Sequence, residues 1–231
     1  SWVEIAASRE SHDYLAELDA RYPEIESVWI ADGNGTVRGS SQFFPALSGN
    51  VSRFDFFRAA RESKSVVFGG RVDTDFQNKV AGPHFFLAQR RTSRDGAFDG
   101  VIVLTFSSTY FQGVWRQSWH NAPQTFTDLT TSDFKVLARE PPTTIKQLNL
   151  GPETLATLRN NPNAGSLRTK AGLDRVERIS AYRRVDPFDA YVIYGVDFDS
   201  VLRTWLRHLL VYGGIFGLAA LGLTAVSLIA A

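Results

Sequence analysis

The last 23 residues of the chain, residues 209–231, contain no charged side chain. As an α-helix such a segment is about 35 Å long, which exceeds the hydrocarbon thickness of a bilayer, about 30 Å. Arg203, Trp205 and Arg207 lie just before it, and residues of these types favour the headgroup region. The sequence therefore predicts a C-terminal transmembrane helix. The alternative is a helix buried in a soluble core, although such helices are rarely so long without a charge.

Two earlier stretches of the chain show the same order of features. Residues 86–106 and 179–198 each contain a strand pattern that ends in an arginine pair, a short turn with Phe-Asp, and a second apolar strand. The segments before them also correspond, because each has a hairpin pattern followed by a helix pattern. Two copies about 90 residues apart indicate a duplicated domain, since solenoids have shorter and more numerous repeats.

The expected elements follow from apolar periodicity and turn residues. Residues 1–20 are expected to form a helix that Pro23 ends, with Ile5, Tyr14, Leu15 and Leu18 as its apolar positions. The first unit is expected to contain strands 25–31 and 36–41, helix 53–63, strands 65–72, 84–92 and 98–106, and helix 107–118. The second unit is expected to contain strands 125–130 and 134–139, helix 151–161, strands 165–170, 175–185 and 190–196, and a helix from 199 that continues into the span.

These elements predict an α+β fold with two units, each an antiparallel sheet with flanking helices. The expected organisation is an N-terminal helix over residues 1–22, a membrane-distal domain over 23–122, a membrane-proximal domain over 123–199, and a juxtamembrane and transmembrane helix over 200–231. Because the chain has no initiator Met and begins inside a helix pattern, we expect it to be a fragment of a longer protein.

Composition and motifs exclude several classes of function. The 25 Lys and Arg nearly balance the 24 Asp and Glu, so a nucleic-acid partner is not expected. The absence of cysteine excludes disulfide scaffolds and Cys-ligated zinc. The glycines of residues 33–39 have the wrong spacing for a dinucleotide site, and a strand follows them. The four histidines are far apart in sequence. We therefore expect no catalytic residue, no metal site and no cofactor.

A cluster of aromatic and charged residues in the first unit is the candidate ligand site. It combines flat apolar surface with both signs of charge, which suits a small zwitterion or a carboxylate. Its members are Arg53, Asp55, Phe56, Phe57, Arg71, Asp73, Asp75 and Arg90. The alternative is that the aromatic residues form core and the charges are solvated.

The arginine pairs, Arg90 with Arg91 and Arg183 with Arg184, allow two interpretations. Neighbours on a strand point to opposite faces, so one arginine of each pair must face the layer that covers the sheet. That inward arginine is either structural, bonded to a carboxylate or carbonyl, or it binds a ligand carboxylate through two hydrogen bonds.

The order of the short motifs "SRFDFFRAAR", "FLAQRR", "RDGAFDGVIVLTFSSTYF" and "AYRRVDPFDAYVIYGVDFDSVLRTW" resembles that of a known family. These are the extracellular double Cache (tandem PAS-like, PDC-type) sensor domains of bacterial membrane receptors such as histidine kinases and diguanylate cyclases. The resemblance implies a ligand pocket in the distal unit and a cytoplasmic output. It also implies that the N-terminal helix packs on both units and pairs with its twin in a homodimer.

The resemblance also suggests roles for individual residues. In amino-acid-binding members of the family, an Arg-x-Trp-Tyr motif holds the ligand carboxylate and a later aspartate binds its amine. Arg53 with Phe56 or Phe57 corresponds to the motif, with phenylalanine in place of both Trp and Tyr and one extra residue. Asp73 or Asp75 corresponds to the later acid. The implied ligand is an amino acid or another small carboxylate.

The function expected from the sequence is ligand sensing in a bacterial signal-transduction receptor, most simply a sensor histidine kinase of a two-component system. A diguanylate cyclase, a chemoreceptor, a membrane-anchored enzyme and a protein-interaction module are the alternatives. No glycine-rich or proline-rich linker separates the last strand from the span, so movement of the sheet is expected to reach the membrane helix. The expected location is the inner (cell) membrane with residues 1–205 periplasmic, although Arg203 and Arg207 on that side run against the positive-inside trend.

Overall fold

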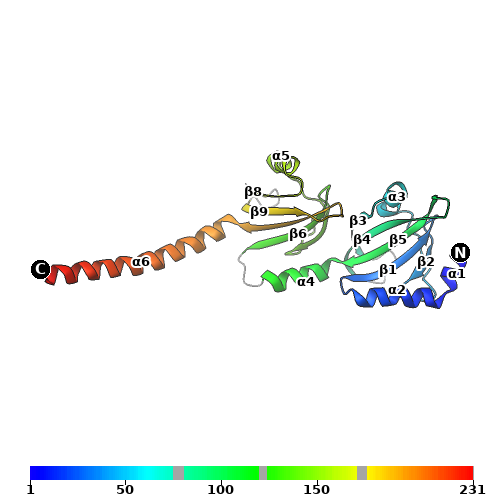
Figure 1. Cartoon of the computed structure of the whole chain (residues 1–231), viewed down its shortest axis with the longest axis horizontal. Helices are drawn as coiled ribbons and strands as arrows, with labels where there is room; N and C mark the ends of the chain where they lie inside the picture. The colour runs from blue at the N-terminus through cyan, green and yellow to red at the C-terminus, as the bar shows by residue number, and fades with distance from the viewer. Residues whose placement is uncertain (75–80, 120–123, 171–175, 231) are drawn as a thin grey trace.

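The computed structural model describes residues 1–74, 81–119, 124–170 and 176–230. They form two five-stranded antiparallel sheets in a row, with one long helix leaving the second sheet (Figure 1). The strand orders are β2-β1-β5-β4-β3 and β7-β6-β10-β9-β8, which are the same order counted from the first strand of each sheet. The predicted α+β fold and its duplication are confirmed.

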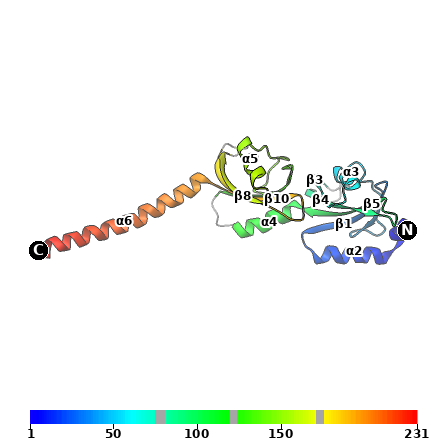
Figure 2. The same ribbon diagram turned by 45° about the horizontal axis from the view of Figure 1, so that its top comes forward.

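The sheet farther from the long helix, with the helices packed on it, is called the distal unit. Helix α3 covers one face of this sheet and α2 covers the other (Figures 1 and 2). Alternating apolar residues of the strands face α3 and make the core with it. The elements are α1 (Trp2–Ala7), α2 (Arg9–Arg21), β1 (Ile25–Asp32), β2 (Val37–Ser40), α3 (Asp55–Glu62), β3 (Val67–Thr74), β4 (Ala81–Thr92) and β5 (Phe98–Ser107).

The second sheet, with α5 on the same side as α3, is called the proximal unit (Figure 2). Helix α4 (Ser108–Trp119) follows β5 directly and packs on β7, so it covers this unit as α2 covers the distal one. The remaining elements are β6 (Thr125–Thr131), β7 (Val136–Glu140), α5 (Pro152–Asn160), β8 (Ala164–Lys170), β9 (Glu177–Arg184) and β10 (Ala190–Asp197).

The N-terminal segment differs from the single helix expected over residues 1–20. It forms two helices, because Ser8 is extended and its hydroxyl accepts a hydrogen bond from the amide of Ser11, which caps α2. Leu15 is buried against the distal sheet as expected, whereas Tyr14 is 63% exposed, so its assignment to the apolar face was wrong. The main contacts of α1 and α2 are with β1 and β2 of the distal unit, and it is α4 that covers the proximal sheet.

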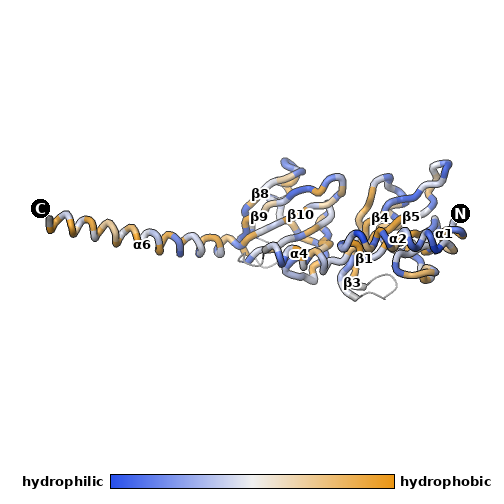
Figure 3. Tube along the Cα trace, turned by 60° about the horizontal axis from the view of Figure 1, so that its bottom comes forward, coloured by the Kyte–Doolittle hydropathy of each residue, from blue (hydrophilic) through white to orange (hydrophobic). Residues whose placement is uncertain are grey.

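The last helix, α6 (Phe198–Ala230), begins at the residue after β10. It is long and apolar enough to cross a membrane, and none of its apolar window is buried in the protein (Figure 3). The alternative of a buried core helix is therefore wrong. Its first turn is held by the proximal unit, because Ser200 is buried and the Arg168 guanidinium lies 3.5 Å from the centre of the Phe198 ring.

The two units are in direct contact. The buried Ser108 hydroxyl, at the start of α4, donates a 2.6 Å hydrogen bond to the carbonyl of Leu137 in β7. Phe68 of the distal unit packs edge-on against Phe188 of the proximal unit, with ring centres 6.0 Å apart. These contacts join the sheets through side chains as well as through the chain itself.

Candidate functional site

Helix α3 holds two of the predicted site residues, Phe56 and Phe57, in the core. Both are almost fully buried, and the Phe56 ring lies 5.0 Å from that of Phe86 on β4. A Cβ atom on Gly69 of β3 would lie 2.9 Å from Phe56, so only glycine fits beside that ring. Both rings belong to the hydrophobic core of the distal unit, and their contact with a ligand stays a prediction.

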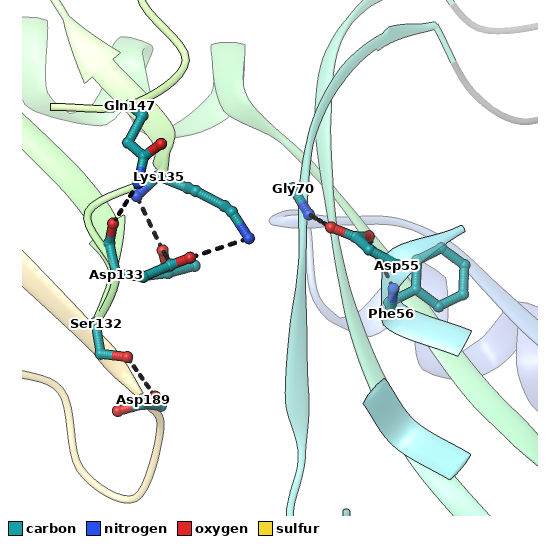
Figure 4. Close-up of polar contacts among 9 residues, drawn as sticks. Asp55, Phe56, Gly70, Ser132, Asp133, Lys135, Gln147 and Asp189 are labelled. Carbon is teal, nitrogen blue, oxygen red and sulfur yellow. Dashed lines mark hydrogen bonds and ion pairs between the residues drawn. The ribbon is translucent and has the colours of Figure 1, made fainter. Parts of the chain in front are cut away.

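The two charged residues at the start of α3 lie at the surface. The exposed Arg53 guanidinium stacks 5.2 Å from the centre of the Phe54 ring. The Asp55 carboxylate accepts hydrogen bonds from the amides of Phe56, at 2.8 Å, and of Gly70 on β3, at 3.4 Å (Figure 4). Asp55 therefore ties the helix N-terminus to the strand, and the position also suits the helix dipole.

Of the predicted residues in and after β3, only the side chain of Arg71 is described, and it contacts the proximal unit. Arg71 donates a 2.9 Å hydrogen bond from Nη2 to the carbonyl of Thr143, which belongs to the proximal unit. Asp73 is within β3, but its side chain is not described, and Asp75 lies outside the described residues. On the proximal side of this junction, Lys135 pairs with Asp133 at 3.0 Å (Figure 4).

The first arginine pair is divided between the two faces of the sheet, as strand geometry requires. Arg90 follows Phe86 and Ala88 on the face that α3 covers, and its guanidinium lies 5.8 Å from the centre of the Phe98 ring. Its Nε is buried and has no hydrogen-bond partner among the described residues. Arg91 points the other way, toward Trp2, with its guanidinium 4.2 Å from the ring centre.

For the second pair, Arg183 and Arg184, the structural interpretation applies, because the inward arginine lies beside carboxylates of the protein. The Arg184 Nε lies 3.4 Å from Asp186, and its Nη2 lies 3.9 Å from Asp189, in the turn that follows β9. Arg183 is exposed. The Nε of Arg90 and that of Arg184 are both buried without a hydrogen-bond acceptor among the described residues, but only Arg184 has carboxylates within 4 Å there.

Arg61 is a neighbour of this site that sequence reasoning missed. Its guanidinium lies 5.6 Å from the centre of the same Phe98 ring that Arg90 approaches. Two cations around one ring favour a bound anion, and a carboxylate can accept two hydrogen bonds from a guanidinium. Arg61 comes four residues after Phe57 and so lies on the same side of α3, which is the signal that could have revealed it.

Metal binding has no support in the described part of the chain. No group of three or more His, Asp or Glu side chains there is placed to hold a metal ion. The polar groups of the distal unit suit hydrogen bonding to an organic ligand, with arginine donors on the α3 face of the sheet.

No protein-family model and no curated protein matches the chain. Solved structures do match it. The extracellular domain of a protein assigned as a histidine kinase, rpHK1S-Z16, is 23% identical with a TM-score of 0.68, over 84% of this chain and 80% of that one. The ligand-binding domain of the Pseudomonas aeruginosa PAO1 amino acid chemoreceptor PctB, solved with L-Arg, is 18% identical with a TM-score of 0.62, over 95% and 88%.

A second extracellular domain of a protein assigned as a histidine kinase, mmHK1S-Z3, is 13% identical with a TM-score of 0.61, over 88% of this chain and 86% of that one. At these identities the likeness establishes the fold. The fold of this chain is that of extracellular sensor domains of histidine kinases and chemoreceptors, so the resemblance to double Cache domains is confirmed at the level of the fold.

Proposed function

We propose that this chain is the extracytoplasmic ligand-sensing region of a bacterial transmembrane signalling receptor, with a histidine kinase as its output. A chemoreceptor or a diguanylate cyclase is the alternative output, and structural neighbours of both the kinase and chemoreceptor kinds support the sensor role. In this proposal residues 1–205 lie outside the inner membrane, α6 crosses it, and the fragment itself is not an enzyme.

The observation that carries this proposal is the direct passage from β10 into α6. The strand ends at Asp197 and the helix begins at Phe198, so no residue separates the sheet from the helix. Arg178 holds the end of the strand through a 2.7 Å ion pair with Asp197. A ligand that favours one arrangement of the sheets therefore also biases the position of the membrane helix.

We place the primary ligand site on the α3 face of the distal sheet, with a small carboxylate such as that of an amino acid as the ligand. A buried guanidinium N–H without an acceptor costs free energy, and a ligand carboxylate at Arg90 supplies that acceptor. In the proposal Arg53 and Asp55, at the start of α3, select the rest of the ligand, and the roles of Arg71, Asp73 and Asp75 in binding stay predictions.

The test is a thermal-shift screen of the whole 231-residue chain in detergent micelles with amino acids, dicarboxylates and purines. A ligand at 100 times its dissociation constant stabilises by about 2.7 kcal/mol, which corresponds to a shift of roughly 5–10 °C for a chain of this size. Arg90→Gln is expected to abolish the shift given by a carboxylate. Arg91→Gln, on the opposite face of the same strand, is the matched control and keeps it. A shift that survives in Arg90→Gln would refute this placement.

We also propose that the receptor is a homodimer that pairs through its N-terminal helices. Val3 of α1 is 75% exposed and Tyr14 of α2 is 63% exposed, and both are on the side of the helices away from the distal sheet. Val3→Glu with Tyr14→Glu is expected to convert a dimer to a monomer in sedimentation experiments. A dimer that persists in this variant would contradict the pairing.

A further inference from the structure

A cavity of about 100 Å³ lies inside the proximal unit, between its sheet and α5. Its floor is one row of the sheet, because the lining residues Tyr182, Ile193, Asp128 and Arg139 are successive partners across β9, β10, β6 and β7. Residues paired in this way point to the same face. Helix α5 lies over this sheet (Figure 2), and its Thr154 and Leu158 line the cavity on the opposite side.

Most of the cavity wall is apolar. Leu158 of α5 and Leu167 of β8 line it, together with Leu148, Phe126 and Tyr191. Thr154 of α5 and Ser180 of β9 add hydroxyl groups. The two tyrosine side chains that border the cavity have their hydroxyls occupied, because Tyr182 donates to the carbonyl of Asn161 at 2.7 Å and Tyr191 to that of Pro162 at 2.9 Å.

The polar end of the cavity is a buried carboxylate with one oxygen unpaired. The Asp128 side chain is 1% exposed, and its Oδ2 accepts a 2.6 Å hydrogen bond from Nη1 of Arg139. Its Oδ1 is buried and has no hydrogen-bond partner among the described residues. The Thr130 hydroxyl, two residues further along β6, is also buried without a described hydrogen-bond partner, but it does not line the cavity. Buried polar atoms are normally paired, so this end of the cavity needs a donor.

The buried charges around this end cancel, and Lys170, the other charged residue of the cavity wall, is exposed and lies opposite Glu177 of β9. Asp128 pairs with Arg139, and Arg178 pairs with Asp197 at 2.7 Å. Both guanidinium groups also lie over the Phe126 ring, at 4.6 Å for Arg139 and 5.5 Å for Arg178. A charged ligand head would therefore add a buried charge with no counter-charge of its own, whereas an uncharged head adds none.

We propose that this cavity is a second ligand site, which takes a small uncharged organic molecule with a short apolar body and a single O–H or N–H donor. The donor bonds to Asp128 Oδ1 and the body packs among the leucine side chains. The size follows from the volume, since a cavity of about 150 Å³ accommodates benzene and this one is smaller. The site is separate from the proposed carboxylate site on the distal sheet.

Occupancy of this cavity acts on the membrane helix by a short route. Ser180 and Tyr182 belong to β9, and Ile193 belongs to β10, which continues directly into α6. A ligand that spreads or tightens these two strands moves the start of the helix without passing through the distal unit. The proximal unit is therefore an independent input to the same output.

Protonation of Asp128 sets the conditions of the test. Burial raises the pKa of the Asp128 carboxyl to about 6, and the attraction of Arg139 and Arg178 offsets only part of that effect. At pH 7.5 the carboxylate is ionised and accepts hydrogen bonds. A donor-bearing ligand is best measured at that pH.

The experiment uses four probes with similar apolar bodies and different heads: 1-butanol, butanone, butylammonium and butyrate. Amide chemical-shift perturbations at Ser180 and Ile193 of the whole chain in micelles report binding, with Val103 of the distal core as the internal reference. A ligand of this size is expected to bind with a dissociation constant on the order of millimolar. Butanol, which donates, is expected to bind about tenfold more tightly than butanone, which only accepts.

Two pairs of variants locate the site. Thr154→Leu fills the cavity from α5 and is expected to remove the perturbations, whereas Ala156→Leu adds the same side chain on the exposed side of that helix and keeps them. Asp128→Asn places an N–H group at the unpaired position and is expected to remove the preference for butanol over butanone. Arg90→Gln, which tests the distal site, leaves all of these results unchanged.

Three outcomes would overturn the inference. The first is the absence of any perturbation by butanol up to about 100 mM, a concentration many times the expected dissociation constant. The second is tighter binding of butylammonium or butyrate than of butanol. The third is that the perturbations by butanol persist in Thr154→Leu. Binding of butanol that Thr154→Leu abolishes and Ala156→Leu preserves would support it, whatever the thermal-shift screen finds for the distal unit.

Discussion

The distal and proximal units have the same sheet order and the same placement of a helix on the sheet, but different interiors. In the distal unit α3 turns Phe56, Phe57 and Ala60 toward the sheet, and all three are buried in one aromatic cluster. In the proximal unit α5 turns Thr154 and Leu158 toward a floor that carries a buried ion pair and a cavity.

This difference shows that the strand order and the packing of the interior are determined by different features of the sequence. Strand order depends on alternation and turn residues, which both copies keep, whereas filling depends on side-chain volume at a few facing positions. The third residue of α3 is Phe57 and the third residue of α5 is Thr154. Exchange of a ring for a small side chain at this position removes much of the volume that fills the distal core.

The largest expected effect is on the free energy of unfolding, when the third residue of α3 or of α5 is replaced by alanine. Phe57→Ala is expected to destabilise the chain by about 3–5 kcal/mol, because a buried ring leaves a cavity that its neighbours cannot fill. Thr154→Ala, which borders space that is already empty, is expected to cost about 1 kcal/mol. Unfolding by urea, followed by circular dichroism, measures both. Equal losses would mean that the two interiors are equally well packed.

The second largest expected effect is a pH dependence of the free energy of unfolding, which comes from the buried Asp128 of the proximal unit. The folded-state pKa of Asp128, about 6, lies above its ordinary value of 3.8, so the folded chain holds this proton more tightly than the unfolded chain does. Its contribution to stability is complete below pH 3.8 and is lost as pH rises through about 6. Arg139 and Arg178 attract the ionised carboxylate and offset part of the effect of burial, and the other titratable residues of the cavity wall are Lys170, Tyr182 and Tyr191.

The measurement is the free energy of unfolding of the wild type minus that of Asp128→Asn, at pH 4 and at pH 7.5. This difference is expected to fall by roughly 2 kcal/mol between the two values, since each pKa unit corresponds to about 1.4 kcal/mol and part of the effect is already lost at pH 4. The subtraction removes the contributions of carboxylates whose pKa is lowered, such as Asp133 and Glu177. A difference that stays constant or rises with pH would show that Asp128 is ionised at little cost.

The smallest expected effect concerns the contact between the units. Ser108→Ala removes the buried hydrogen bond to the Leu137 carbonyl and is expected to cost about 1–2 kcal/mol. Ser118→Ala, on the exposed surface of the same helix, is the control and is expected to change stability very little. Hydrogen exchange in β4 and β9 shows whether the loss is shared. Faster exchange in only one sheet would mean that the units unfold separately.

Much of the fold could be predicted from the sequence, and the errors have physical causes. Every expected strand and helix of the two units is present, because apolar alternation and Gly-containing turns are local signals. The break at Ser8 was missed because a serine at a helix cap looks the same in sequence as a serine within a helix. Tyr14 was counted among the apolar positions by residue type, but in the same helix Leu15 is the residue that is buried and Tyr14 is exposed.

The candidate site was predicted only in part. The division of Arg90 and Arg91 between two faces follows from strand geometry and is confirmed. Whether Phe56 is core or ligand wall could not be read from its neighbours in sequence, because the answer depends on Gly69 and Phe86 across the sheet. The role of the eight predicted residues in ligand binding stays a prediction.

The sequence by itself determined that the chain repeats one unit twice and ends in a helix able to cross a membrane, because periodicity, turn residues and an uncharged stretch act over short distances along the chain. Only the tertiary structure decided that the distal interior is aromatic at α3 while the proximal one holds a cavity beside Asp128. That cavity is bounded by residues from Phe126 to Ile193 on five strands and a helix, and the volume left among them depends on packing that no local pattern encodes.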